Sequence, residues 1–130
     1  MSDVSGAFDI YTARYYITAC DLLSDAYLHA GKCGKKFKFP LGQHLSATAA
    51  EFFDHILLLS YLNQPADFLK MSLLLHRLFA HYRMLKQFNQ LSKESYINAL
   101  ARIDSLREFL DIYQTMGKAA ACEAGLSARA

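Results

Sequence analysis

The sequence contains no tryptophan, only two prolines and only three cysteines among its 130 residues. The cysteines (Cys20, Cys33 and Cys122) are odd in number and show no paired spacing, so they indicate neither a disulfide framework nor a zinc site. We expect reduced thiols, as in a cytosolic chain. No apolar run approaches the roughly 20 residues that span a bilayer, and the start, MSDVSGAFD, lacks the features of a signal peptide. The expected location is cytoplasmic, without membrane contact.

Catalytic motifs are missing as well. The sequence has no glycine-rich phosphate loop, no GxSxG elbow and no Cys–His pair with a nucleophile signature. A di-metal centre in a helical bundle needs two Glu-x-x-His motifs and further carboxylates, whereas here only Glu51 and His55 approach that pattern. His76 and His81 would diverge by about 140° on a helix. We therefore expect no catalytic residue, no metal site, no cofactor and no enzymatic activity.

Apolar residues are abundant instead. Hydrophobic residues make up 53% of the chain and charged residues 20%, and the mean hydropathy is +0.07. These values exceed those of a typical small soluble domain, so part of the apolar surplus is expected at a subunit interface. The length predicts one domain. We assign residues 1–117 to this domain and residues 118–130 to a tail that is either flexible or an extension of the last helix.

Four stretches have the three- and four-residue spacing of apolar side chains that predicts amphipathic helices. They cover about residues 7–30, 40–62, 66–89 and 92–117. Gly31 is expected to end the first helix, Pro40 to lie in the first turn of the second, Ser92 to cap the fourth and Gly117 to end it. Because two connections are very short, the pattern predicts an all-α, up-down-up-down antiparallel four-helix bundle.

Each predicted helix contributes one apolar row to the expected core. The rows are Ile10, Ala13, Ile17 and Cys20, widened by Phe8, Tyr11, Tyr15 and Leu22; Leu41, Leu45, Ala49, Phe52, Ile56 and Leu59; Phe68, Met71, Leu75, Leu78, Tyr82 and Leu85; and Tyr96, Leu100, Ile103, Leu106, Leu110 and Tyr113. The third helix has a second apolar row roughly 180° from its first, formed by Leu69, Leu73, Ala80 and Met84. A helix that is apolar on two opposite faces needs two burial partners. We predict that this second row is a subunit interface, with one crowded core as the alternative.

Positive charge is concentrated in the middle of the chain. Residues 32–93 contain nine Lys or Arg and three acids, whereas the remainder contains five and nine. The segment GKCGKKFKFP combines four lysines with Phe37 and Phe39; it is either a solvated loop, a phosphate-gripping and base-stacking loop, or a loop whose phenylalanines seal the bundle. The predicted nucleic-acid-binding residues are Lys32, Lys35, Lys36, Lys38, Lys70, Arg77, Arg83 and Lys86.

Several short motifs carry a resemblance to a known family. They are FPLGQHL at residues 39–45, AAE at 49–51, YRML at 82–85, and Leu91-Ser92 followed by Tyr96. Across about residues 8–113 the chain resembles the four-helix-bundle proteins that include the accessory variability determinant (Avd) of diversity-generating retroelements and the proteins of ribosomal RNA intervening sequences. Arg83 and Arg107 match arginines that recur in this family. Phe79 replaces a frequent arginine, and Asp111-Ile112-Tyr113 replaces a glycine-and-tryptophan ending.

The resemblance implies a function. Avd proteins are non-enzymatic homopentamers that bind nucleic acid and associate with a reverse transcriptase during mutagenic copying of a template RNA. The expected partners are therefore further copies of this chain, a reverse transcriptase, RNA and also DNA. The alternative hypothesis is a structural or protein-interaction bundle of the intervening-sequence type without a reverse-transcriptase partner.

Overall fold

A computed structural model describes residues 13–60 and 67–117. Its helices are α2 (Arg14–Lys32), α3 (Lys35–Phe37), the π-helical turn η2 (Lys38–Gln43), α4 (His44–Ser60), α5 (Phe68–Gln87) and α6 (Lys93–Met116). No strand occurs within these ranges. The predicted all-α four-helix bundle is confirmed. The predicted turn at Asn63-Gln64-Pro65 and the predicted tail at 118–130 lie outside the described residues.

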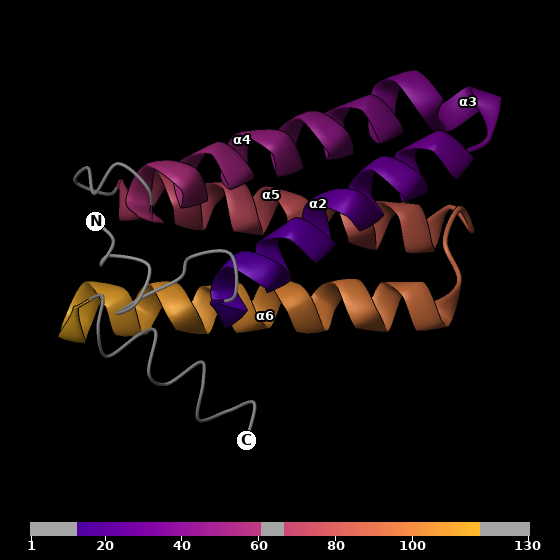
Figure 1. Ribbon diagram of the computed structural model, residues 1–130. Coiled ribbons are helices and arrows are strands. Elements are labelled where there is room, and N and C mark those ends of the chain that lie inside the picture. The colour runs from indigo at the N-terminus through magenta and orange to yellow at the C-terminus, as the bar shows by residue number, and fades with distance from the viewer. Residues whose placement is uncertain (1–12, 61–66, 118–130) are drawn as a thin grey trace.

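The four long helices surround one core. In Figure 1, α2, α4, α5 and α6 alternate in direction along the chain. Helix α2 contacts α4 and α6, and α5 also contacts both. Every long helix therefore has two neighbours. In the described part of the chain, no helix is long and apolar enough to cross a membrane.

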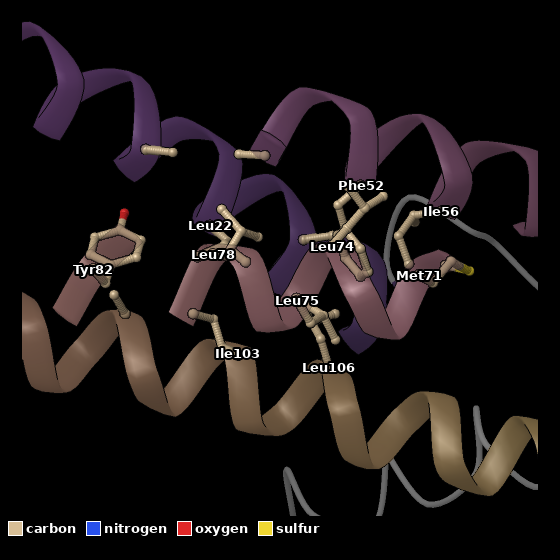
Figure 2. Close-up of a cluster of buried hydrophobic side chains, with 14 of the residues drawn as sticks. Leu22, Phe52, Ile56, Met71, Leu74, Leu75, Leu78, Tyr82, Ile103 and Leu106 are labelled. Atoms are coloured by element: carbon tan, nitrogen blue, oxygen red, sulfur yellow. The ribbon is translucent and has the colours of Figure 1, made fainter. Parts of the chain in front are cut away.

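The core rows of α4 and α5 agree with the sequence pattern. All six predicted residues of the second row are buried, Leu41 in η2 and the other five, from Leu45 to Leu59, in α4. In α5 the predicted row is buried from Met71 to Leu85, and Leu74 joins it on the side toward α4 in the cluster shown in Figure 2. Fully burying one such aliphatic side chain contributes roughly 1.5–3 kcal/mol. These two rows are therefore a major source of the bundle's stability.

The predicted row of α2 is confirmed at Ala13 and at the flanking Tyr15 and Leu22, and it is wrong at Ile17. The structure buries Tyr15, Ala19, Leu22 and Ala26, whereas Ile17 is 38% exposed. Cys20 is half-buried, and the predicted residues Phe8, Ile10 and Tyr11 lie outside the described range. Tyr15 stacks on Phe109 of α6 with a centroid distance of 4.2 Å. The helix is thus rotated so that two alanines and one tyrosine, rather than Ile17, face the core.

The connection between α2 and α4 is shorter and more helical than predicted. Helix α2 continues through Gly31 to Lys32, and only Cys33 and Gly34 separate it from the next helical turn. A glycine in a helix costs about 1 kcal/mol relative to alanine, which weakens a helix without ending it. Pro40 lies inside η2 instead of opening a helix. A proline cannot donate a backbone hydrogen bond, and near the beginning of η2 this missing donor is tolerated.

The ends of α5 and α6 are fixed by local hydrogen bonds. The Asp67 carboxylate accepts a hydrogen bond from the Lys70 amide at 3.0 Å. The Ser92 hydroxyl oxygen accepts one from the Ser95 amide at 3.1 Å, which confirms the predicted N-cap. Gly117 has a φ of 98° and follows the last residue of α6, so the predicted end is also confirmed.

Candidate nucleic-acid and subunit interfaces

The lysine-rich turn between α2 and α4 carries uncompensated positive charge. Lys32 ends α2, Lys35 and Lys36 form most of α3, and Lys38 begins η2. All four side chains are exposed. Among the described residues, none of the four forms an ion pair. Their charges therefore act together on whatever approaches this turn.

The fold places the connection between α5 and α6 against this turn. The Gly34 amide donates a hydrogen bond of 2.8 Å to the Gln90 side-chain oxygen, 56 residues away in the sequence. The Phe37 ring stacks on the Phe88 ring, with centroids 5.0 Å apart. Figure 1 shows α3 at the same end of the bundle as this connection. Two distant lysine-bearing segments thus form one surface.

We call this surface the basic end and define it as residues 31–43 and 86–93. It contains six lysines and no carboxylate. Two of the lysines, Lys86 and Lys93, come from the α5–α6 side, where they close α5 and open α6. Such a one-signed cluster raises the local concentration of polyanions and steers their approach.

Close backbone contacts fix the shape of the basic end. A Cβ atom on Gly42 would lie 3.0 Å from the Ala30 carbonyl oxygen and 3.4 Å from the Ala30 Cα. Residue 42 must therefore be glycine for η2 to pack this closely on α2. On the other side, Asn89 adopts a φ of 59°, which ends α5 and turns the chain toward α6.

The outer cations of α5 lie on two flanks of the helix. The Lys70 ammonium lies 3.4 Å from the Glu51 carboxylate of α4. The His81 ring meets the His44 ring of α4 with centroids 6.3 Å apart. On the opposite flank, the Arg83 guanidinium lies 5.9 Å from the centre of the Phe79 ring. Phe79 lines a groove between α5 and α6 together with Ile103 and Arg107.

The eight predicted nucleic-acid-binding residues therefore do not form one continuous surface. Lys86 joins Lys32, Lys35, Lys36 and Lys38 at the basic end. Lys70 lies 16 residues earlier on the same helix, about 24 Å away along its axis, and its charge is offset by Glu51. Arg77 and Arg83 are exposed between these two ends. The basic end is the strongest of the candidate binding regions.

The second apolar row of α5 is exposed in the single chain. Leu69 is 83% exposed, Leu73 50% and Met84 46%, and Ala80 is exposed as well. Their positions along one outer strip of α5 match the sequence prediction. Contiguous apolar surface of this kind marks sites of protein association. Burial of this row between subunits stays a prediction.

A polar cluster inside the bundle was missed by the sequence analysis. Arg102 of α6 is half-buried and pairs with Asp25 of α2. Nearby, the Tyr82 hydroxyl lies 2.9 Å from His29 Nδ1. Burial raises the pKa of Tyr82 and lowers that of His29, so both side chains stay neutral near pH 7. The position of Arg102 one residue before the core residue Ile103 was the only hint of this contact.

His81 has a different environment from His76, as their spacing predicts. Its Nδ1 atom is buried without a hydrogen-bond partner. Burial, followed by the charges of Arg77 and His44, lowers the pKa of His81. His76 instead lines the α5–α6 groove and is exposed. In residues 13–60 and 67–117, no group of three or more His, Cys, Asp or Glu side chains is arranged to hold a metal ion.

Comparisons of the chain with models of known families, with curated proteins and with solved structures give no match. The class of protein is therefore defined by the fold and its surfaces: a four-helix bundle with a basic end and an exposed apolar row on α5.

Proposed function

We propose that this protein is a non-enzymatic, nucleic-acid-binding subunit of a homo-oligomer, and that it accompanies a reverse transcriptase of the diversity-generating retroelement type. The observation that carries the proposal is the basic end, where six lysines from two distant segments gather with no carboxylate among them. The alternative function, a purely structural bundle, leaves this concentration of charge without a role.

Electrostatics supports a polyanionic partner. Lysine side chains that contact phosphates release condensed counterions, and this release drives binding that weakens as salt rises. The net charge of the whole protein is only +2. The net charge of the protein therefore attracts a polyanion only weakly, and a local surface must supply the affinity for it. The basic end is the local surface with the highest density of positive charge.

The exposed row of α5 supports self-association. Leu69 and Leu73 are large aliphatic side chains on the face opposite the core. Equivalent rows on identical subunits can pack against each other or against a second shared surface, which is how homo-oligomers close. The subunit number of five and the reverse-transcriptase partner rest on the resemblance to the Avd family.

The motif residues behind that resemblance have two kinds of position. Leu41, Leu45, Tyr82 and Leu85 are buried in the core, and Gly42 makes the close contact with α2. These residues support the likeness of fold. Other motif residues are exposed, among them Phe39, Met84 and Arg83, and of these three only Arg83 carries a charge. It is the motif residue best placed to contact a partner.

The test is RNA binding by charge-reversed variants of the full chain. Lys35→Glu with Lys36→Glu should weaken binding of a labelled RNA and reduce the slope of log affinity against log salt by roughly 1.5, because each lost phosphate contact contributes about 0.7–0.9. Adding Arg83→Glu should weaken binding further. Binding that is unchanged in all variants at low and at high salt would overturn the proposal.

A matched control separates the basic end from total charge. Arg14→Glu changes the net charge by the same amount as Lys35→Glu alone, but Arg14 begins α2, at the opposite end of that helix from the basic end. This variant should bind RNA nearly as well as the parent protein. For the polymerase partner, a reverse-transcriptase gene and a pair of near-identical repeats are expected beside the gene for this chain.

A further inference from the structure

Two phenylalanine rings are exposed at the basic end. Phe39, in η2, is 72% exposed, and Phe88, immediately after α5, is 46% exposed. Phe37 is less exposed than either ring: it is half-buried and stacks on Phe88 at an interplanar angle of 20°. Packing accounts for Phe37. It does not account for Phe39, which contributes little to any core.

Lysines lie close in sequence to the phenylalanines in both segments of the basic end. Lys36 Nζ lies 5.7 Å from the centre of the Phe37 ring. Lys38 precedes Phe39 directly, and Lys86 lies two residues before Phe88. A strand whose phosphates contact these lysines would bring its bases within reach of the rings. Cations alternating with aromatic rings are the usual composition of surfaces that bind single strands.

The rings favour one form of nucleic acid. In a duplex the bases are stacked on each other and paired, so an exposed phenylalanine cannot reach their faces without disrupting the helix. In a single strand each base can stack on a protein ring, whatever its identity. Lysines alone would bind both forms through phosphates. The rings therefore add affinity for the single strand only.

We propose that the basic end binds unpaired nucleic acid, with phosphates on its lysines and bases stacked on Phe39 and Phe88, and that it prefers a single strand to a duplex. This inference rests on the proposed function and specifies its ligand. A neutral apolar partner would fit the rings but leave six lysines unpaired. The density of positive charge thus selects a polyanion with planar groups, which describes single-stranded RNA or DNA.

The experiment compares two probes on the full chain: a labelled oligouridine, which stays unstructured, and an RNA duplex of equal length. Phe39→Leu keeps an apolar side chain of similar size at an exposed position, so the fold should be unaffected. It should weaken oligouridine binding about fivefold or more, the effect expected for loss of one base–ring stack. Duplex affinity and the salt dependence of both probes should not change.

Two further variants locate the effect. Phe88→Leu should also weaken oligouridine binding selectively, and circular dichroism checks that loss of its contact with Phe37 leaves the helices intact. Phe79→Leu is the matched control, because Phe79 is a 37% exposed ring beside a cation, nine residues before Phe88. Oligouridine binding by this control should equal that of the parent protein.

The failures are distinguishable. If the parent binds both probes and Phe39→Leu has no effect, or weakens both equally, the stacking inference is overturned and the proposed function stands. An equal loss in Phe79→Leu would overturn the assignment to the basic end. If the parent binds neither probe, the proposed function itself is overturned. A changed oligomer size in Phe39→Leu would assign the ring to a subunit contact and also overturn the inference.

Discussion

Helix α5 has two apolar faces with opposite environments. On the inner face, Met71, Leu78 and Tyr82 are fully buried between α4 and α6. On the outer face, Leu69 is 83% and Leu73 50% exposed. The residue types are nearly the same on the two faces. Apolar periodicity therefore identifies helix surface that requires burial. The number of helices in one chain decides how much of that surface the monomer itself can cover.

The largest difference is expected from shortening one leucine on each face. Leu78→Ala leaves a cavity among buried side chains and should lower the free energy of unfolding by about 2–5 kcal/mol. Leu69→Ala removes a side chain that is mostly in solvent and should change it by less than about 0.5 kcal/mol in the monomer. Urea denaturation of both variants measures the contrast. Equal losses of unfolding free energy in the two variants would show that both faces are buried to the same extent in the monomer.

The second prediction concerns assembly. Leu73→Glu places a carboxylate in the outer row, and burying it between subunits without a partner is strongly unfavourable. We expect an oligomer of the parent protein to dissociate, with subunit affinity reduced at least a hundredfold, or about 3 kcal/mol. Sedimentation or light scattering gives the mass. A monomeric parent protein would refute a subunit interface on this face.

The third prediction contrasts an inward with an outward ion pair. Asp25 and Arg102 join α2 to α6. Their side chains are 29% and 32% exposed, so both charges are partly shielded from solvent. Asp25→Asn should lower the free energy of unfolding by about 1–3 kcal/mol, because Arg102 loses its charged partner at a site where water cannot fully take over the hydrogen bond. Glu51→Gln, which breaks the more exposed pair with Lys70, should cost about 0–1 kcal/mol. Thermal unfolding of both variants supplies the comparison.

The smallest effect is a pH dependence of stability. Burial holds the pKa of His29 and His81 below the ordinary value of 6.5. The unfolded chain therefore takes up protons first as the pH falls, so stability is fully present above pH 6.5 and declines below it. Each histidine contributes at most about 1.4 kcal/mol per pH unit.

A matched pair of variants tests this dependence. His81→Gln and His29→Gln should each flatten the decline of stability below pH 6.5. Chemical denaturation at several pH values between 7.5 and 5 provides the curves. An unchanged slope in His81→Gln would remove His81 from the acid response and leave His29 as its source.

The sequence predicted most of the fold because large aliphatic side chains recur over long stretches. In α4, large side chains such as Leu45, Phe52 and Ile56 recur at helical spacing, and the whole row is buried as predicted. In α2 the buried positions include Ala19 and Ala26, which carry little hydrophobic signal, while the larger Ile17 is exposed. Periodicity alone cannot tell which of two neighbouring rows faces the core when the buried one is made of small residues.

The sequence predicted which lysines the candidate site contains, but not which segments pack together to form it. The four lysines of the turn were identified because charge is visible in the sequence. Their contact with Phe88 and Gln90 depends on tertiary packing across more than 50 residues. No local pattern marks either residue as a partner of that turn. The same limit hid the pairing of Asp25 with Arg102.

The Asp25–Arg102 pair also has a consequence for synthesis of the chain. It joins residues 77 positions apart, so the first and last described helices are direct neighbours. At about 5–20 residues per second, a ribosome needs roughly 4–15 s to extend the chain from one to the other. Until α6 emerges, Tyr15 and the inner face of α5 lack the helix that packs against them. The nascent chain must therefore remain unaggregated, with part of its core exposed, for several seconds before the bundle can close.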